Sequence, residues 1–139
     1  MASETPAAQI EARLRANWTT TPIFVENGNQ GNFVPPKGQD GKAVPFVVLE
    51  FPAAVADNDG IGRVHYLEEG TFMLHVNVRS GTGATLARSY CDTLAAIFRG
   101  QVFGFVFTYA PFPPTPSEPT DGNYFRLSFG TPYKYRYAV

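Results

Sequence analysis

Alternation of apolar and polar side chains is clearest in the stretch Thr71–Arg79. A period of two predicts a strand with one buried face. Glu68-Glu69-Gly70 precedes this strand, and we expect a three-residue turn there, which would place Tyr66 opposite Phe72 in a hairpin. The buried face of the predicted strand consists of Phe72, Leu74, Val76 and Val78.

The pattern changes to helical spacing after Ser80-Gly81-Thr82-Gly83, which we expect to stop the strand. Ala84–Arg99 predicts an amphipathic helix, and Gly100 is well placed to end it. The strand and the helix would form two layers of a core, within Gly62–Gly100, to which the other segments add. The apolar stripe of the helix is Leu86, Tyr90, Leu94 and Phe98, with Ala87, Cys91 and Ile97 beside it.

The N-terminal segment predicts a short helix, which Ser3 or Thr5 can cap with Pro6 in its first turn. Thr21–Glu26 then predicts a short strand, and Pro45–Pro52 predicts another. The second strand has apolar residues on both faces, so we expect an inner strand that is covered by helices on one side and by something else, which could be a partner subunit, on the other. The apolar face of the short helix is Ala7, Ile10, Leu14 and Trp18.

Two loops are expected around these strands. Asn27–Lys42 contains four glycines and few apolar groups. Loops of this length are uncommon in compact domains and are often functional, although a plain surface loop is the alternative. Ala53–Ile61 is the second expected loop, with Asp57 and Asp59 near its tip.

The last third of the chain again alternates. Val102–Tyr109 and Tyr124–Phe129 predict two strands that pair as a hairpin with a long tip. Ala110–Asn123 contains five prolines, which lack backbone donors, so we expect an extended connection there. Near the C-terminus three tyrosines share one face of a last edge strand or terminal arm. These tyrosines are Tyr133, Tyr135 and Tyr137. They either contact a partner, since tyrosine is enriched at interfaces, or pack on the domain's own core.

Composition narrows the class of protein. The chain has 139 residues, which predicts a single domain spanning residues 1–139. Net charge is −1 with scattered charges, which argues against a strongly basic nucleic-acid binder. Nothing resembles a signal peptide or a membrane span, and Cys91 is the single cysteine. We therefore expect a soluble protein from a reducing cytoplasm, without membrane contact.

Candidate catalytic groups are few. His65 and His75 are expected on the outer face of the sheet without a nearby carboxylate or cysteine, which makes a poor metal site. Cys91 is interpreted as a small core residue. Gly81-Thr82-Gly83 lacks both the third glycine of a dinucleotide site and the lysine of a phosphate loop. The sequence therefore predicts no catalytic residue, no cofactor and no metal, and hence no enzyme.

A calcium loop is the one metal alternative that the sequence leaves open. Asp57, Asp59, Gly62 and Glu68 partly fit the spacing of such a loop. Ile61 stands at a ligand position, however, and no helices flank the segment. A plain acidic turn is the favoured interpretation.

The order of elements and several short motifs resemble a known family. The chain is similar to phage tail terminator proteins of long-tailed phages and of related gene transfer agents, and the similarity covers most of its length. The motifs that carry it are Ile10-Glu11-Ala12-Arg13-Leu14, Thr21-Pro22-Ile23, Pro45-Phe46-Val47, Val76-Asn77-Val78 and Ser80-Gly81-Thr82-Gly83, then Ala87–Asp92, Leu94 and Phe98-Arg99.

This resemblance implies an α+β fold, with a mixed, mostly antiparallel β-sheet and two helices packed on one face. It implies a structural protein of the virion tail, assembled in the bacterial host cytoplasm as a homo-oligomer, a hexameric ring. Such a ring caps the tail tube protein and joins it to the head connector (neck) protein, and DNA passes through it without sequence-specific binding.

We expect the contacts of such a ring to come from loops, strand edges and the chain end. There are two alternatives to a tail terminator. One is another head–tail joining protein, and the other is a small-ligand binding protein or enzyme that uses His65, Asp57 and tyrosines. The candidate interface residues are Phe33, Pro35, Lys37, Asp57, Asp59, Tyr133, Tyr135 and Tyr137.

Overall fold

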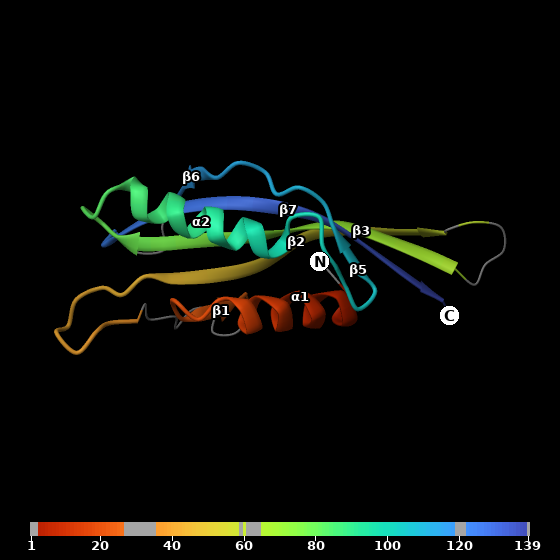
Figure 1. Cartoon of the computed structure of the whole chain (residues 1–139), viewed down its shortest axis with the longest axis horizontal. Coiled ribbons are helices and arrows are strands. Elements are labelled where there is room, and N and C mark those ends of the chain that lie inside the picture. Colours follow the sequence, from red (N-terminus) through yellow and green to blue (C-terminus); the bar gives the residue numbers. More distant parts are fainter. Residues whose placement is uncertain (1–2, 27–35, 59, 61–64, 119–121, 139) are drawn as a thin grey trace.

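The computed structural model describes residues 3–26, 36–58, 60, 65–118 and 122–138. This part of the chain forms two helices, the first followed by three strands and the second by four (Figure 1). None of the described helices has the length and apolar character needed to cross a membrane. The elements are α1 (Glu4–Asn17), β1 (Ile23–Val25), β2 (Phe46–Asn58), β3 (His65–Arg79), α2 (Ala84–Phe98), β4 (Val102–Phe103), β5 (Val106–Thr108), β6 (Thr115–Ser117) and β7 (Tyr124–Ala138).

The strands form one sheet in the order β1-β2-β3-β7-β5-β4, and β6 pairs with β7 beside this path. β1 runs parallel to β2, and every other pairing in the described sheet is antiparallel. Both helices pack on one face of the sheet (Figure 1). The predicted class, α+β with a mixed, mostly antiparallel sheet, is confirmed.

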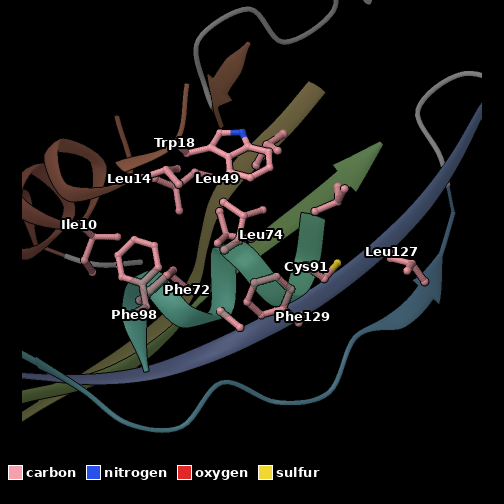
Figure 2. Packing of buried hydrophobic residues seen from close by; sticks show 14 of the residues in the cluster. Ile10, Leu14, Trp18, Leu49, Phe72, Leu74, Cys91, Phe98, Leu127 and Phe129 are labelled. Carbon is pink, nitrogen blue, oxygen red and sulfur yellow. The ribbon is translucent and has the colours of Figure 1, made fainter. Parts of the chain in front are cut away.

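The core lies between the helices and this face of the sheet (Figure 2). The four alternating residues Phe72, Leu74, Val76 and Val78 are all 0% exposed, as predicted. α1 contributes Ile10 and Leu14, and Trp18 follows directly after it; α2 contributes Ala87, Cys91, Leu94, Ala95 and Phe98.

Glycines set both ends of α2. Gly81 and Gly83 have φ angles of 89° and 87°, in the region that glycine tolerates because it has no Cβ. Gly100, with φ of 57°, follows the last turn as the typical αL residue. The predicted helix and its glycine boundaries are confirmed, with the last helical residue at Phe98.

β2 and β3 are longer than the sequence predicts. The predicted loop Ala53–Ile61 is wrong as far as Asn58, because Ala53–Asn58 continues β2. The predicted turn Glu68-Glu69-Gly70 is also wrong, because these residues lie within β3. Gly70 lies there because the strands approach closely: a Cβ on it would lie 2.8 Å from the carbonyl oxygen of Ala53 and 2.9 Å from Cε1 of Tyr133. Gly70 is therefore required by the close approach of neighbouring strands and not by a turn.

The C-terminal third also differs from the prediction. Val102–Tyr109 is not one strand, since β4 and β5 form a tight hairpin around Gly104, whose φ is 58°. β7 is one strand of 15 residues that includes the three tyrosines, and β3 pairs along all of it. β5 pairs with its C-terminal half instead of with Tyr124–Phe129. The proline-rich connection, predicted to contain no strand, contributes β6.

The second face of the sheet carries a smaller aromatic cluster at β2. Phe46 is 1% exposed on the face opposite the helices. Its ring lies 5.7 Å from Phe24 and 5.0 Å from Tyr124 in edge-on contacts. The inner strand predicted at Pro45–Pro52 is therefore covered on its second face, at this point, by the chain itself.

Candidate assembly surfaces

Three strands extend past the ends of both helices (Figure 1). We call this part of the sheet the arm and define it as Ala53–Asn58 of β2, His65–Gly70 of β3 and Tyr133–Ala138 of β7. Both flanking strands pair with β3 in the arm, as in the row Asn58, Tyr66 and Tyr137. Beyond its base, where Glu68 and Tyr133 are buried, the arm presents both of its faces without a covering helix.

A stack of tyrosines lies on the arm. The rings of Tyr66 and Tyr137 are 5.5 Å apart with planes at 21°, and those of Tyr135 and Tyr137 are 5.3 Å apart at 18°. All three side chains are half-buried. Large, rigid aromatic side chains of this kind are enriched where proteins bind one another. The sequence predicts Tyr66 opposite Phe72 in a hairpin and not among the interface residues, but both residues lie on β3, and Tyr66 pairs with Tyr137. Its even-numbered position places it on the face of the predicted apolar residues.

Tyr133 differs from the other two C-terminal tyrosines. Its side chain is 1% exposed and belongs to the core cluster. The hydroxyl donates to Oε2 of Glu68 at 2.7 Å. Burial raises the pKa of this phenol, and the hydrogen bond to Glu68 raises it further. Of the predicted row of three, Tyr133 therefore packs within the chain, while Tyr135 and Tyr137 lie at the surface of the arm.

The calcium-loop alternative does not fit the strands. Glu68 is 3% exposed, and its oxygens accept hydrogen bonds from Ser3 and Tyr133. Asp57 pairs with Leu67 in the antiparallel register and so lies on the other face of the sheet. The two carboxylates cannot ligate one cation. Asp59 and Gly62 lie outside the described residues, within which no three metal-binding side chains gather.

Charge on the face opposite the helices differs between the strands. β7 carries Arg126, Lys134 and Arg136 on this face and no carboxylate, whereas β2 carries Glu50 and Asp57 and no cation. Lys134 also lies over the rings of Phe107 and Tyr109, at 4.8 and 5.7 Å. Within the arm, this face carries Asp57 on its β2 side and Lys134 and Arg136 on its β7 side.

A basic depression lies at the opposite end of the sheet, where β3 ends. It encloses about 350 Å³, and its charged lining residues are Lys37, Lys42 and Arg79. An isolated bridge between Lys37 and Ala43 shapes one wall. Lys37, a predicted interface residue, is thus exposed beside two other cations. Phe33 and Pro35 lie outside the described residues.

A hydrogen-bonded chain crosses the sheet on the face opposite the helices. His75 Nε2 lies 2.6 Å from Oε2 of Glu50, His75 Nδ1 lies 2.6 Å from Oγ of Ser128, and Ser128 Oγ lies 2.5 Å from Oγ of Ser117. The expectation that neither histidine has a carboxylate neighbour is wrong for His75, which is 7% exposed. It is correct that His75 lies on the face opposite the helices. His65 is exposed at the other end of β3.

The protonation state of His75 in this row of hydrogen bonds follows from its surroundings. Burial lowers the pKa of His75 and Arg126 lowers it too, while the hydrogen bond to Glu50 acts in the opposite direction. Neutral His75 donates from Nε2 to Glu50 and accepts at Nδ1 from Ser128, whose oxygen accepts from Ser117. The four side chains come from four strands, so the chain links β2, β3, β7 and β6.

Glu50, His75 and Ser128 have the residue types of a hydrolytic triad, which requires a nucleophile that a substrate can reach. Ser128 is 4% exposed, and its hydroxyl already contacts His75 and Ser117. This arrangement holds strands together and offers no accessible nucleophile.

Comparison with known proteins agrees with the architecture. A family model for phage tail terminator proteins matches residues 7–129, so the chain belongs to this family of phage tail structural proteins. No curated protein matches the chain. One similar solved structure is 23% identical in sequence; the match covers 97% of this chain and 96% of the other, with a TM-score of 0.57. At this identity the similarity concerns the fold alone.

Proposed function

We propose that this protein forms a hexameric ring of identical subunits, which caps the tail tube and joins it to the head connector. The observation that carries this proposal is the arm with its tyrosine stack, within a chain of the tail terminator family. Each subunit of a cyclic ring presents two different patches to its neighbours. The side of the arm that carries Asp57 and the side that carries Lys134 and Arg136 are two such patches.

A cap also contacts one partner below it and another above it. The two ends of this sheet differ in chemistry as such a role requires: the arm is aromatic, and the depression at the other end is basic. Tail tube protein and connector protein are the proposed partners, and DNA would pass through the ring without sequence-specific binding. The proposed contact residues are Lys37, Asp57, Tyr135 and Tyr137, together with Phe33, Pro35 and Asp59.

The proposed ring would act in the virion tail after assembly in the host cytoplasm, with residues 1–139 as one domain. Electron microscopy of particles that lack this gene tests the role. Overlong tails are expected, because nothing would stop polymerisation of the tube. Filled heads without tails would contradict the proposal and would indicate a connector protein instead.

The tyrosine stack can be tested by complementation of that deletion. Replacing Tyr135 and Tyr137 with alanine should leave a folded protein, checked by circular dichroism, but abolish normal tail length. Phe105→Ala is the control, since Phe105 is an aromatic residue that is 74% exposed and lies outside the arm. Normal tails with the double variant would remove the stack from the proposed contacts.

The segment Asn27–Lys42, which the sequence predicts to be a loop, is the second proposed contact. Shortening it within Gly28–Pro35 should leave a folded protein that no longer caps tubes. The base of the loop should be kept, because the hydroxyl of Tyr124 donates to the carbonyl oxygens of Pro36 and Val44, at 3.1 Å each. A pull-down with tail tube protein measures the effect, and a scrambled segment of equal length is the control. Wild-type capping by the shortened protein would exclude this loop.

A further inference from the structure

The arm has an open backbone edge along β2. β1 pairs with β2 only over Val47–Leu49, and the side chain of Glu26 then accepts the N–H of Phe51 at 3.0 Å. After Phe51, no strand in the described part of the chain pairs with Ala53–Asn58 on the side away from β3. Half of the length of β2 therefore lies at the edge of the sheet.

This edge lacks the devices that usually protect edge strands. Natural proteins block such edges with lysine, proline, or a bulge that turns the strand away. Pro52 and the bulge between Glu50 and Ala53 lie before the open segment. The segment itself reads Ala-Ala-Val-Ala-Asp-Asn, and the side chain of Val55 is 75% exposed. It is a template for one more strand.

The other side of the arm also extends past its neighbour. β5 pairs with β7 over Tyr133–Tyr135, so Tyr137 and Ala138 continue beyond the end of β5. Because β2 and β7 both run antiparallel to β3, they run in the same direction. A copy of the subunit rotated about an axis along the strands would place the end of its β7 beside β2, with the two strands parallel. Repetition of this step closes a ring.

Charge decides between this contact and a two-fold contact. Pairing β2 with β2 of a second copy would place Asp57 of each copy near the carboxylate-bearing edge of the other, which is unfavourable. Pairing β2 with β7 places Asp57 near the C-terminal end of β7, where the charged residues are Lys134 and Arg136. Complementary charge of this kind fixes the partner and the register of a contact.

We infer that the end of the open β2 edge in one subunit, Asp57 and Asn58, pairs with Arg136–Ala138 of β7 in the next subunit, so that the tips of the arms form one continuous sheet. This inference rests on the proposed ring and names the contact that builds it. The occupant of the open edge is thus a second copy of the same chain, held head to tail.

Charge exchange tests the pairing in the full chain. Asp57→Arg makes both edges of the arm basic, and Arg136→Asp makes the end of β7 acidic like β2. Each variant alone should lose the wild-type oligomer in native mass spectrometry at low ionic strength, where surface charges are least screened. An equal mixture of the two variants should regain an oligomer of alternating subunits, because each acidic edge then meets a basic one.

The control is Arg88→Asp, the same charge change at an exposed site on α2, which should leave the oligomer unchanged. Circular dichroism checks that every variant is folded. Wild-type oligomers from both single variants, or a mixture that stays monomeric, would overturn the edge pairing alone. A wild-type chain that stays monomeric even with tail tubes present would instead overturn the proposed ring.

Discussion

The hydroxyl of Tyr133 donates a 2.7 Å hydrogen bond to Oε2 of Glu68, across two neighbouring strands at the base of the arm. The same carboxylate accepts the backbone N–H of Ser3 at 3.2 Å, just before α1. A buried carboxylate is tolerated only where donors satisfy its oxygens. Glu68 thus ties β7 and the start of α1 to β3, at the point where the arm leaves the core.

This relationship predicts the effect of Tyr133→Phe. Removing the hydroxyl leaves a buried carboxylate with one donor fewer, which should lower the free energy of unfolding by about 1–3 kcal/mol. Urea unfolding of the variant measures the change. Tyr135→Phe is the control, since Tyr135 is only half-buried on the same face. Equal stability of the two variants would contradict the role assigned to the Tyr133 hydroxyl.

Gly70→Ala should also destabilise the fold. The added Cβ would lie 2.8 Å from the carbonyl oxygen of Ala53, a backbone atom that cannot rotate away. Overpacking of this kind costs about 1–3 kcal/mol, seen as a lower melting temperature. Gly122→Ala is the matched control, because nothing lies within 4 Å of a Cβ at Gly122. An unchanged melting temperature for Gly70→Ala would show that β2 and β3 can separate here without cost.

Leu94→Ala probes the contact between α2 and the sheet. Leu94 is 0% exposed within the core cluster. Truncation loses transfer free energy and leaves a cavity, so the free energy of unfolding should fall by about 2–5 kcal/mol. Arg88→Ala, on the exposed face of the same helix, should change it little. Similar melting shifts for both variants would reject the assigned face of α2.

Stability should decrease as the pH falls below about 6.5, the ordinary pKa of histidine. Burial lowers the pKa of His75 in the folded state, so the unfolded chain binds a proton first and unfolding is favoured in acid. The stabilisation is complete above pH 6.5 and is lost as the pH falls through the lowered pKa. Glu50, Arg126 and Ser128 are the groups that face His75.

The free energy of unfolding, measured between pH 7.5 and pH 5, tests this linkage. His75→Gln should flatten the curve in this range, whereas His65→Gln, at an exposed site, should follow the wild type. A wild-type slope in the His75→Gln variant would assign the pH dependence to another group.

Cys91 should not react with thiol reagents while the protein is folded. Its side chain is 1% exposed, and burial raises the pKa of the thiol to about 12. The thiolate is the reactive form, so labelling at pH 8 should follow global unfolding. Rapid labelling of the native protein, with full labelling in urea as the reference, would show that α2 opens locally.

Two patterns in the sequence were enough to predict the central part of the fold. Alternation in Thr71–Arg79 and helical spacing in Ala84–Arg99 both report which side of one element is apolar, and the structure buries the predicted strand face. His75 and Asn77 are buried on the other face of the strand as well, and of the predicted helix stripe Leu86 and Tyr90 are only half-buried. Such periodicities follow from backbone geometry within a single element, so a local stretch of sequence carries them. The fold class of the whole sheet was implied by the resemblance to a known family.

The extent of the strands depended on contacts between distant segments. Gly70 and the prolines before β7 carried turn and breaker signals, yet the former lies inside β3 and the connection provides β6. Whether a glycine marks a turn or a close approach depends on the neighbouring strand, here on Ala53 and Tyr133.

The candidate surfaces were only partly predictable, because they too depend on contacts between distant segments. The row of C-terminal tyrosines was visible in the sequence, but pairing with β3 decided that Tyr133 is buried and that Tyr66 joins the stack. The His75 chain joins residues that are 25 and 53 positions apart. The sequence by itself determined which side of each element is apolar. Only the tertiary structure decided the register between the strands, and this register determines which side chains meet.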